Sequence, residues 1–309
     1  MGKFSELKLA AVDIGSNAIR MQISNALIHE NDVVFKKVEY IRFPLRLGAD
    51  VFTFGKITQK NEEKFVKLMQ NFKNFVELYE TDDYMACATS AMREASNGEE
   101  IALRVYYNIG LKINIIDGQR EAELINKSIY NYIQDGNYLH IDVGGGSTEL
   151  NVYVNRQKIN SKSYPLGSVR HYSEETFFYQ MKEIREWLSA QPFLPLIPVI
   201  GIGTGGNINK LFELTEKKKG NRVKLKHIEQ TANCIANMSL EERLFKLKLN
   251  HDRADVIVPA SRIYLEILHM VGAKEIIVPD MGLKDGIIIS LYENFKKNNN
   301  RFGISYDSR

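Results

Sequence analysis

Apolar positions along the chain predict short strands and amphipathic helices. Residues 7–54 alternate or run apolar, which predicts a meander of strands that includes the stretch after Arg46-Leu47-Gly48. In residues 57–80 apolar side chains recur every three or four positions, which is typical of an amphipathic helix. The buried face of this helix is expected to contain Phe65, Leu68, Phe72, Phe75, Val76 and Tyr79.

The rest of the chain repeats strand and helix in turn, which predicts an α/β fold. We expect strands at 84–89, 113–116, 137–143, 150–154, 158–164, 199–204 and 275–280. We expect helical segments at 90–106, 117–125, 165–188, 229–250 and 253–271, and a last helix ending near 291. The segment 253–271 is expected to be interrupted at Pro259.

The most informative stretch is 137–150, which reads NYLHIDVGGGSTEL. Its apolar run is followed by Asp142, the glycines Gly144, Gly145 and Gly146, and then Ser147, Thr148 and Glu149. Consecutive glycines permit a tight turn whose N–H groups face one way, which is an arrangement suited to phosphate. The serine and threonine can add hydroxyl donors, and the two acids have the oxygen ligands that a divalent cation prefers.

A similar stretch lies near the N-terminus, where residues 9–23 read LAAVDIGSNAIRMQI. Its apolar strand leads into Asp13, Gly15, Ser16 and Asn17, with Arg20 beyond them. A single copy could be a hairpin turn with a surface acid. Two copies in one chain favour two related half-domains, each with a phosphate-binding hairpin.

A third acid follows a strand at residues 117–125, which read DGQREAELI. Glu121 falls in the first turn of the expected helix, near the positive end of its dipole. Such a residue often only stabilises its helix from the surface. Because strand–turn–acid units recur in this half of the chain, Glu121 is also a candidate functional acid.

Composition and charge give no sign of a nucleic-acid-binding, secreted or membrane-spanning protein. With 309 residues the chain is long enough for two domains, and its net charge of +3 gives no global argument for a polyanion partner, nucleic acid included. The basic stretch 217–227 is either a solvated loop or a local polyanion contact. We see no signal peptide and no membrane span, so a cytoplasmic location is expected.

Two further features bear on organisation. The stretch 199–208, VIGIGTGGNI, adds another glycine loop, although it is a weak match to a dinucleotide-binding fingerprint. The expected boundary between domains lies near residue 125, which gives domains 1–124 and 125–309 with the last helix returning to the first. Both phosphate loops would then face one interdomain cleft, whose closure could exclude water.

The ordered set of motifs resembles the exopolyphosphatase and guanosine pentaphosphate phosphatase family. The resemblance rests on VDIGSNAIRMQI, ATSAMREASNG, IIDGQREAELI, IDVGGGSTEL, GIGTGGNI and RADVIVPA, between about Ala11 and Gly286. It implies the fold of actin, heat-shock chaperone ATPases and sugar kinases, with two ribonuclease-H-like domains. The chain is similar to the short two-domain members of the family.

The resemblance also implies roles for individual residues. It implies that Glu121 is the general base, that Asp142 and Glu149 bind Mg²⁺ and position water, and that Arg93 neutralises a phosphoryl oxygen. Phosphate would be bound by Asp13, Gly15, Ser16 and Asn17 of the first loop, by Gly144, Gly145, Gly146 and Ser147 of the second, and by Arg46. The chain departs from the family pattern at Ala18, where a serine is frequent, and at Gln119-Arg120, where acids are frequent.

These roles predict a Mg²⁺-dependent hydrolase acting on the terminal phosphate of inorganic polyphosphate or on the 5′-γ-phosphate of pppGpp. One alternative is an ATP-dependent kinase or ATPase of the same fold. Another is a non-catalytic sensor of polyphosphate or an alarmone nucleotide, although a binder needs cations more than three acids. The apolar C-terminal helices make a homodimer an additional expectation.

Overall fold

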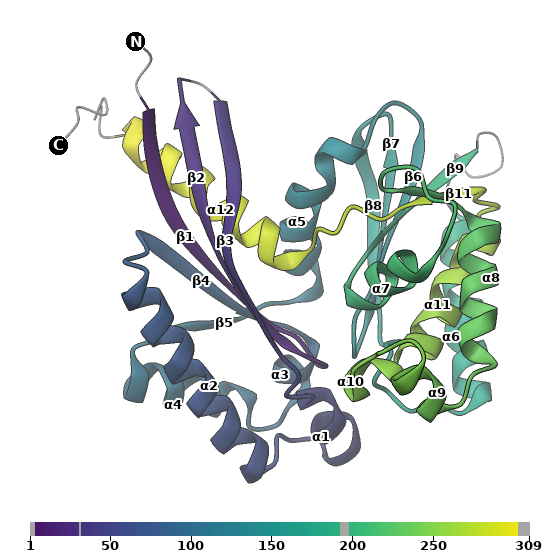
Figure 1. Ribbon diagram of the computed structural model, residues 1–309, viewed down its shortest axis with the longest axis horizontal. Coiled ribbons are helices and arrows are strands. Elements are labelled where there is room, and N and C mark those ends of the chain that lie inside the picture. Colours follow the sequence, from purple (N-terminus) through teal and green to yellow (C-terminus); the bar gives the residue numbers. More distant parts are fainter. Residues whose placement is uncertain (1–3, 31, 192–197, 302–309) are drawn as a thin grey trace. The chain divides into compact units, whose positions relative to one another are not determined.

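Packing divides the chain of this computed structural model into two α/β units, each built on its own sheet (Figure 1). The structure describes residues 4–30, 32–191 and 198–301. Of these, residues up to 117, 123–128 and 283–301 form unit 1, and residues 118–122 and 129–282 form unit 2. The division by packing thus differs from the predicted boundary near residue 125 only within 118–128, and the last helix lies in unit 1, the return to the first domain that the sequence suggested.

The sheet of unit 1 has the strand order β3-β2-β1-β4-β5. Antiparallel pairing joins β1 (Phe4–Ile14), β2 (Ile19–His29) and β3 (Asp32–Phe43). On the other side of β1, β4 (Asp83–Ala88) and β5 (Ile113–Ile115) pair in parallel. The carboxyl ends of β1, β4 and β5 therefore lie along one edge of the sheet.

Helices cover β1 on both faces, which explains its continuous apolar run. Ala10, Val12 and Ile14 share a core with α2 (Gln59–Leu78) and α4 (Gly98–Ile109). The C-terminal helix α12 (Leu283–Arg301) also packs on β1, outside that core cluster. Successive strand residues point to opposite faces, so an uninterrupted apolar run is what a strand between two helical layers requires.

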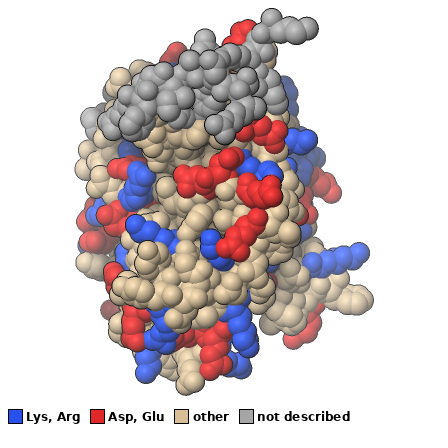
Figure 2. All heavy atoms as spheres, turned by 90° about the vertical axis from the view of Figure 1, so that its left-hand side faces the viewer, with Lys and Arg blue, Asp and Glu red and all other residues tan. Residues whose placement is uncertain are grey.

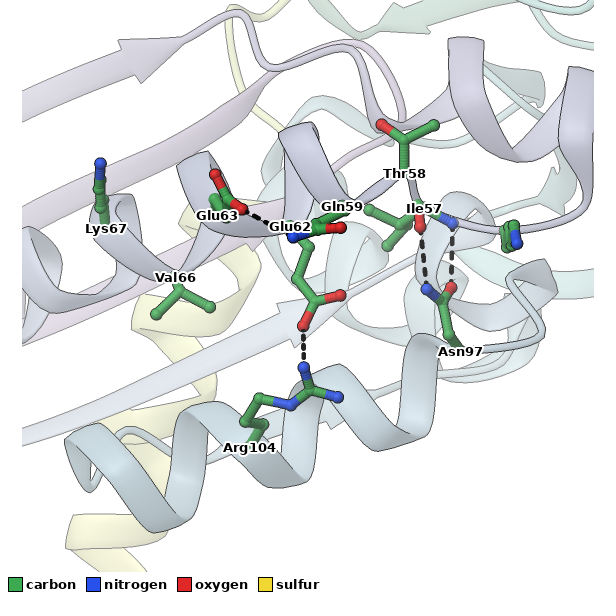
Figure 3. Close-up of a pocket in the computed structure, with 10 residues that line it drawn as sticks. Ile57, Thr58, Gln59, Glu62, Glu63, Val66, Lys67, Asn97 and Arg104 are labelled. Atoms are coloured by element: carbon green, nitrogen blue, oxygen red, sulfur yellow. Dashed lines mark hydrogen bonds and ion pairs between the residues drawn. The ribbon is translucent and has the colours of Figure 1, made fainter.

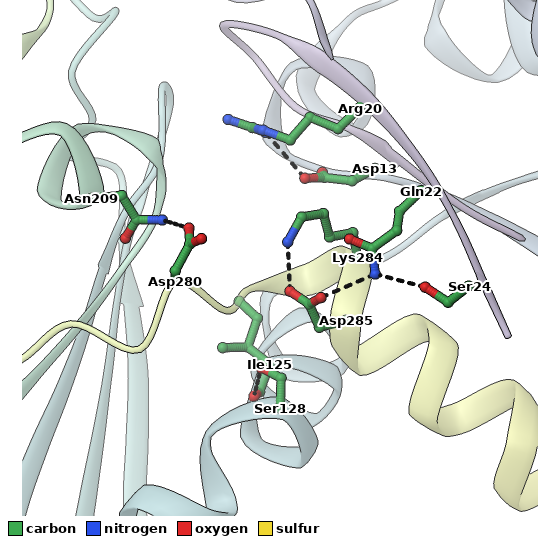
Figure 4. Close-up of polar contacts among 10 residues, drawn as sticks. All are labelled: Asp13, Arg20, Gln22, Ser24, Ile125, Ser128, Asn209, Asp280, Lys284 and Asp285. Atoms are coloured by element: carbon green, nitrogen blue, oxygen red, sulfur yellow. Dashed lines mark hydrogen bonds and ion pairs between the residues drawn. The ribbon is translucent and has the colours of Figure 1, made fainter. Parts of the chain in front are cut away.

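Polar contacts fix the first turn of α12 on β2 (Figure 4). The Gln22 amide donates to Ser24 Oγ and to Asp285 Oδ1, both at 3.1 Å, and Lys284 Nζ donates to Asp285 Oδ2 at 2.6 Å. The apolar side of α12, including Ile287, is buried. These apolar side chains suggested a homodimer, but they are used inside unit 1. The homodimer therefore stays a prediction without support from this helix.

The sheet of unit 2 has the strand order β10-β11-β9-β6-β7-β8. The strands are β6 (Asn137–Val143), β7 (Thr148–Val154), β8 (Gln157–Tyr164), β9 (Val199–Thr204), β10 (Arg222–Lys224) and β11 (Glu275–Ile277). Parallel pairing joins β6, β9 and β11, whereas β7 and β8 follow β6 as antiparallel strands. The helices of this unit are α6 (Glu174–Ser189), α7 (Gly206–Leu214), α8 (Leu225–Ala236), α9 (Leu240–Phe245), α10 (His251–Ala254) and α11 (Ile257–Met270).

The two sheets share one topology. The order β3-β2-β1-β4-β5 corresponds strand by strand to β8-β7-β6-β9-β11, with the same parallel and antiparallel pairs. Each glycine loop lies between the first and second strand of its sheet. The predicted α/β class with two related halves of the ribonuclease-H type is confirmed.

Local predictions were wrong at several places, including 229–250, where α8 ends and the separate helix α9 follows. The stretch after Arg46 is the helix α1 (Leu47–Phe54), whose start is fixed by the hydrogen bond from the Gly48 amide to the Ser16 carbonyl and which buries Leu47, Gly48 and Val51. Residues 90–97 lead into the helix α4, as expected, but they also contain a short helix of their own, α3 (Ser90–Glu94). The break in 253–271 precedes Pro259, which occupies the first turn of α11.

Close packing of α12 against residues 123–128 generates a stability prediction. A Cβ on Gly286 would lie 1.9 Å from the Leu124 carbonyl oxygen, so Gly286→Ala forces backbone apart. We expect a loss of about 1–3 kcal/mol in the free energy of unfolding, measured by denaturant titration. Gly282→Ala is the control, because a Cβ there meets no atom within 4 Å. Equal stability of the two variants would contradict the prediction.

Candidate active site

The first glycine loop closes the hairpin between β1 and β2 in unit 1. Asp13 of β1 lies directly opposite Arg20 of β2, and its carboxylate is 3.1 Å from the Arg20 guanidinium (Figure 4). Within the loop, the hydroxyl group of Ser16 is 2.8 Å from that of Ser90. The charge of Asp13 is therefore balanced by a partner on the neighbouring strand.

A distant segment holds the carbonyl oxygens of this first loop. The Arg46 amide donates to the Asn17 carbonyl at 3.1 Å, and the Gly48 amide donates to the Ser16 carbonyl at 2.8 Å. A Cβ on Gly48 would lie 2.9 Å from the Ser16 Cβ, so a glycine is needed for this approach. The structure thus brings Ser16, Asn17 and Arg46 together, as the family resemblance implied.

Arg93 lies at the carboxyl edge of the same sheet. It belongs to α3, which follows β4, and its Nη1 donates to the Ile116 carbonyl at 2.6 Å, just beyond β5. Asp13, Ser90 and Arg93 therefore gather where the parallel strands of unit 1 end. The crevice outside the carboxyl ends of parallel strands is where α/β sheets commonly bind ligands.

The second glycine loop, Gly144–Ser147, closes the hairpin between β6 and β7 in unit 2. The Gly144 amide donates to the Ser147 carbonyl at 2.9 Å, which closes the turn. The carbonyl oxygens of Gly144, Gly145 and Gly146 accept hydrogen bonds from the Ser168 amide (3.0 Å), the Val169 amide (2.8 Å) and Arg170 Nε (2.5 Å). The loop carbonyls are thus satisfied by one other segment, Gly167–Arg170.

Because Gly167–Arg170 occupies the carbonyl side of the loop, the amide side is left for an anion. Among the described residues, no protein acceptor pairs with the amides of Gly145, Gly146 and Ser147. Because the carbonyls are held by Gly167–Arg170, these amides are left for a ligand, and unpaired amides of a turn can bind an anion such as phosphate. A Cβ on Gly167 would lie 2.4 Å from the Gly145 carbonyl oxygen, so this contact also requires a glycine.

Sequence reasoning missed the bracing segment. Residues 165–170 were predicted to open a helix, but they form a turn because the Ser168 and Val169 amides bind the glycine carbonyls. The helix α6 begins later, after Ser173, whose side chain accepts from the Thr176 amide at 3.1 Å. The glycine at position 167 was the available signal.

Asp142 and Glu149 occupy the positions in unit 2 that correspond to Asp13 and Arg20 in unit 1. They lie directly opposite each other on β6 and β7. Glu149 is only 2% exposed, and its Oε1 accepts from Ser147 Oγ at 2.6 Å and Ser163 Oγ at 3.0 Å. Like charges directly opposite in a sheet are destabilising, so this pair fits a bound cation where unit 1 has an arginine.

The helix that carries Glu121 begins beside the same carboxylate pair. In α5 (Gly118–Ile129), Glu121 lies in the first turn. A Cβ on Gly118 would lie 3.2 Å from the Cβ of Ser163, whose hydroxyl donates to Glu149. A single side chain, that of Ser163, therefore lies between the start of the helix and Glu149.

A third glycine loop follows β9. Gly205 has a φ of 105°, in the left-handed region, and a Cβ there would lie 2.9 Å from Asp142 Oδ1. Beyond it, Asn207 Nδ2 donates to Ser168 Oγ at 3.3 Å, and the Arg253 guanidinium donates to the Gly206 carbonyl. The loop after β9 is thus connected to the bracing segment and closes around Asp142.

A buried polar network crosses β6 behind these loops. The Asn151 amide nitrogen is 3.0 Å from His140 Nδ1, and His140 Nε2 is 2.8 Å from Thr204 Oγ1. Since an amide nitrogen only donates, Nδ1 accepts and Nε2 carries the proton. Burial lowers the pKa of His140 to about 3, with a smaller contribution from the charge of Lys158.

A separate pocket of about 710 Å³ lies on unit 1 (Figure 3). Cations such as Lys56 and Arg104 alternate there with Glu62 and Glu63, and Arg104 is paired with Glu62. None of the predicted phosphate or metal ligands lines it. Its mixed charge gives no reason to expect a phosphate ligand.

The basic stretch 217–227 is partly structural. Lys218 Nζ donates to the carbonyls of Phe212 and Glu213, and Arg222 pairs with Glu275 at 2.8 Å. Figure 2 draws only the left-hand side of the view in Figure 1, which does not show this stretch, and basic and acidic side chains are interspersed on that face. A role of 217–227 in binding a polyanion stays a prediction. Along the described ranges, no helix has the length and apolar character needed to cross a bilayer.

Two strand–acid–glycine hairpins, one with a second acid opposite the first, define a phosphate-handling protein of α/β class. The family model that matches the chain is that of the Ppx/GppA phosphatase family, over residues 27–295. The chain therefore belongs to the Ppx/GppA phosphatase family. The resemblance found in the motifs and the predicted phosphatase class are confirmed.

Individual relatives are distant but cover most of the chain. Exopolyphosphatase 1 of Mycobacterium bovis is 24% identical over 92% of this chain and 88% of its own length. The guanosine-5′-triphosphate,3′-diphosphate pyrophosphatase of Pseudoalteromonas atlantica is 21% identical over 94% of this chain and 60% of its own length. A solved structure of an exopolyphosphatase from Cytophaga hutchinsonii superposes with a TM-score of 0.77, at 22% identity, over 93% of this chain and 98% of that one.

The lowered pKa of His140 predicts how stability depends on pH. Because the unfolded chain binds the proton near the usual pKa of 6.5, and the folded protein only near 3, stability is full above 6.5 and falls as the pH decreases below it. We expect His140 to contribute a loss of about 1.4 kcal/mol per pH unit between pH 6 and 4. Denaturant titrations without divalent cations measure this, with His140→Gln as reference. Parallel pH curves for the two proteins would contradict it.

Proposed function

We propose that this chain is a Mg²⁺-dependent hydrolase that releases terminal orthophosphate from inorganic polyphosphate, the 5′-γ-phosphate of pppGpp, or both. The observation that carries the proposal is the second hairpin, where an amide nest adjoins two opposed carboxylates. An amide nest binds an anion, and a carboxylate pair favours a cation. Phosphate and Mg²⁺ together satisfy both.

Phosphate would be bound mainly by backbone amides and arginines. In unit 2 the donors are the amides of Gly145, Gly146 and Ser147. In unit 1 the donors are the first loop with Ser16 and Asn17, together with Arg46 and Arg93. The protein does little covalent work in phosphoryl transfer, so positioning and charge neutralisation account for most of the rate.

Glu121 is the proposed general base. Its helix starts at Gly118 beside Ser163, which donates to Glu149, so the turn that contains Glu121 begins near the carboxylate pair. A carboxylate here would orient water and accept its proton as the terminal P–O bond breaks. General-base catalysis of this kind is typically worth about 10²–10⁴-fold.

Asp142 and Glu149 would hold the Mg²⁺ ion, which when bound supplies neutralisation of charge on the transferring phosphoryl group. The fit rests on the donor set, because both residues offer the oxygen ligands that Mg²⁺ prefers. In the described residues no group of three or more His, Cys, Asp or Glu side chains is arranged around a metal position. Mg²⁺ commonly binds through one or two carboxylates and takes its other ligands from water and phosphate.

The choice of substrate follows the names of the relatives, which include an exopolyphosphatase and a guanosine pentaphosphate pyrophosphatase. Both substrate classes end in the same phosphoryl group. The loops described above would contact only that group, so they give no basis for discriminating between the two.

The proposed catalytic role of Glu121 predicts a loss of activity on substitution. With Mg²⁺, the purified protein should release phosphate from long polyphosphate, short polyphosphate or pppGpp, and Glu121→Gln should lower kcat by about 10²–10⁴-fold with substrate binding retained. Glu123→Gln, in the same helix, is the control. Near-full activity of Glu121→Gln would remove the base assignment. Tight binding of all three compounds without release by the natural protein would indicate a sensor.

The proposed Mg²⁺ ligands Asp142 and Glu149 predict a change in the Mg²⁺ requirement on substitution. Asp142→Asn and Glu149→Gln should each raise the Mg²⁺ concentration needed for half-maximal activity by about tenfold or more, because each removes a ligand charge. The control is Asp135→Asn, whose side chain is exposed in the turn before β6. Phosphate release that persists undiminished with a chelator would refute the requirement for Mg²⁺.

A further inference from the structure

Tyr264 is a buried polar residue with no part in the chemistry proposed above. It lies on α11, is 0% exposed, and its hydroxyl reaches the carboxyl ends of two neighbouring strands. The hydroxyl donates to the Thr204 carbonyl at the end of β9 and accepts from the Val143 amide at the end of β6, the latter at 3.1 Å. One oxygen atom therefore joins β6 to β9.

The position of this bridge along the sheet gives it significance. Parallel pairing between β6 and β9 ends at Asp142 and Thr204. Beyond that pair the strands diverge into the loop Gly144–Ser147 and the loop that starts at Gly205. The Tyr264 hydroxyl spans the point of divergence, where the backbone ladder no longer holds the strands together.

Asp142 lies against this bridge. A Cβ on Gly205 would be 2.9 Å from Asp142 Oδ1 and 3.7 Å from the Tyr264 hydroxyl, so both groups crowd one point. Burial raises the pKa of Tyr264, and the charges of Asp142 and Glu149 raise it further. The tyrosine is thus a neutral group, able to donate and accept at once, beside the carboxylate pair.

We propose that Tyr264 is a positioning residue for the cation and phosphate site of unit 2: its hydroxyl sets the spacing of β6 and β9 and thereby holds Asp142 and the loop Gly144–Ser147 in place. The inference rests on the function proposed above. The network of Asn151, His140 and Thr204 supports the same strands within the sheet, from His140, two residues before Asp142, to Thr204 at the end of β9. Tyr264 acts where that network ends.

Removing the hydroxyl would leave two buried backbone groups without a partner. In Tyr264→Phe the Val143 amide loses its acceptor and the Thr204 carbonyl loses its donor, while the aromatic ring still fills the core. Buried groups of this kind seek new partners, so the ends of β6 and β9 would shift. Such a shift displaces Asp142 and the glycine amides together.

The test compares Tyr264→Phe with Tyr164→Phe. Tyr164 is also buried in unit 2, but its hydroxyl has no hydrogen-bond partner among the described residues. For Tyr264→Phe we expect Mg²⁺ affinity, measured by isothermal titration calorimetry without substrate, to fall about tenfold. We expect kcat to fall by a similar factor, KM for the phosphate substrate to rise because the glycine amides move with Asp142, and excess Mg²⁺ to restore part of kcat but not KM. Tyr164→Phe should leave all three unchanged.

Other outcomes overturn the proposal. A Tyr264→Phe protein with natural Mg²⁺ affinity and kcat but a lower Tm, or one that is unfolded at 25 °C, would assign the hydroxyl to stability alone. Calorimetry separates this inference from the proposed activity. A natural protein that binds Mg²⁺ but hydrolyses nothing would defeat the hydrolase and leave the positioning role measurable. A natural protein that binds no Mg²⁺ would defeat both.

Discussion

The constraint on which unit 2 depends is the contact between two backbone loops. Gly167–Arg170 takes up the carbonyl oxygens of Gly144, Gly145 and Gly146, and this decides which way the glycine amides point. A flexible glycine loop has many conformations, and hydrogen bonds on its carbonyl side select one of them. The amides proposed to bind phosphate are therefore preorganised by a segment that would not itself touch the anion. The same segment binds Asn207 and so connects the loop after β9.

Tertiary support of this kind also separates what the sequence could predict from what it could not. Strand–acid–glycine hairpins are local, so the positions of Asp13, Asp142 and Glu149 and the first turn at Glu121 followed from patterns within about fifteen residues. The stretch after Arg46 and residues 165–170 were assigned wrongly because their conformation is fixed by Ser16 and by the glycine carbonyls, far away in the chain. Local periodicity contains no information on such partners.

The return of the last helix shows the same limit. Polar contacts from Gln22 to Asp285, and the close approach of Gly286 to Leu124, join segments that are separated by most of the chain. The sequence suggested that this helix returns to the first half, but not that its apolar side would be fully used there. Likewise, His140 and Tyr264 read as ordinary core residues in the sequence. Only the structure shows that their polar atoms bridge strands next to the glycine loops.

The paired hairpins carry an implication for the history and use of this fold. Two halves with one topology are what duplication of an ancestral gene leaves behind, and here the copies differ at a corresponding pair of strand positions: acid and base in one, acid and acid in the other. One strand position, Arg20 in the first hairpin and Glu149 in the second, thus decides whether a hairpin contains a counter-charge for its aspartate. The two hairpins can therefore be compared within one molecule, each as the reference for the other.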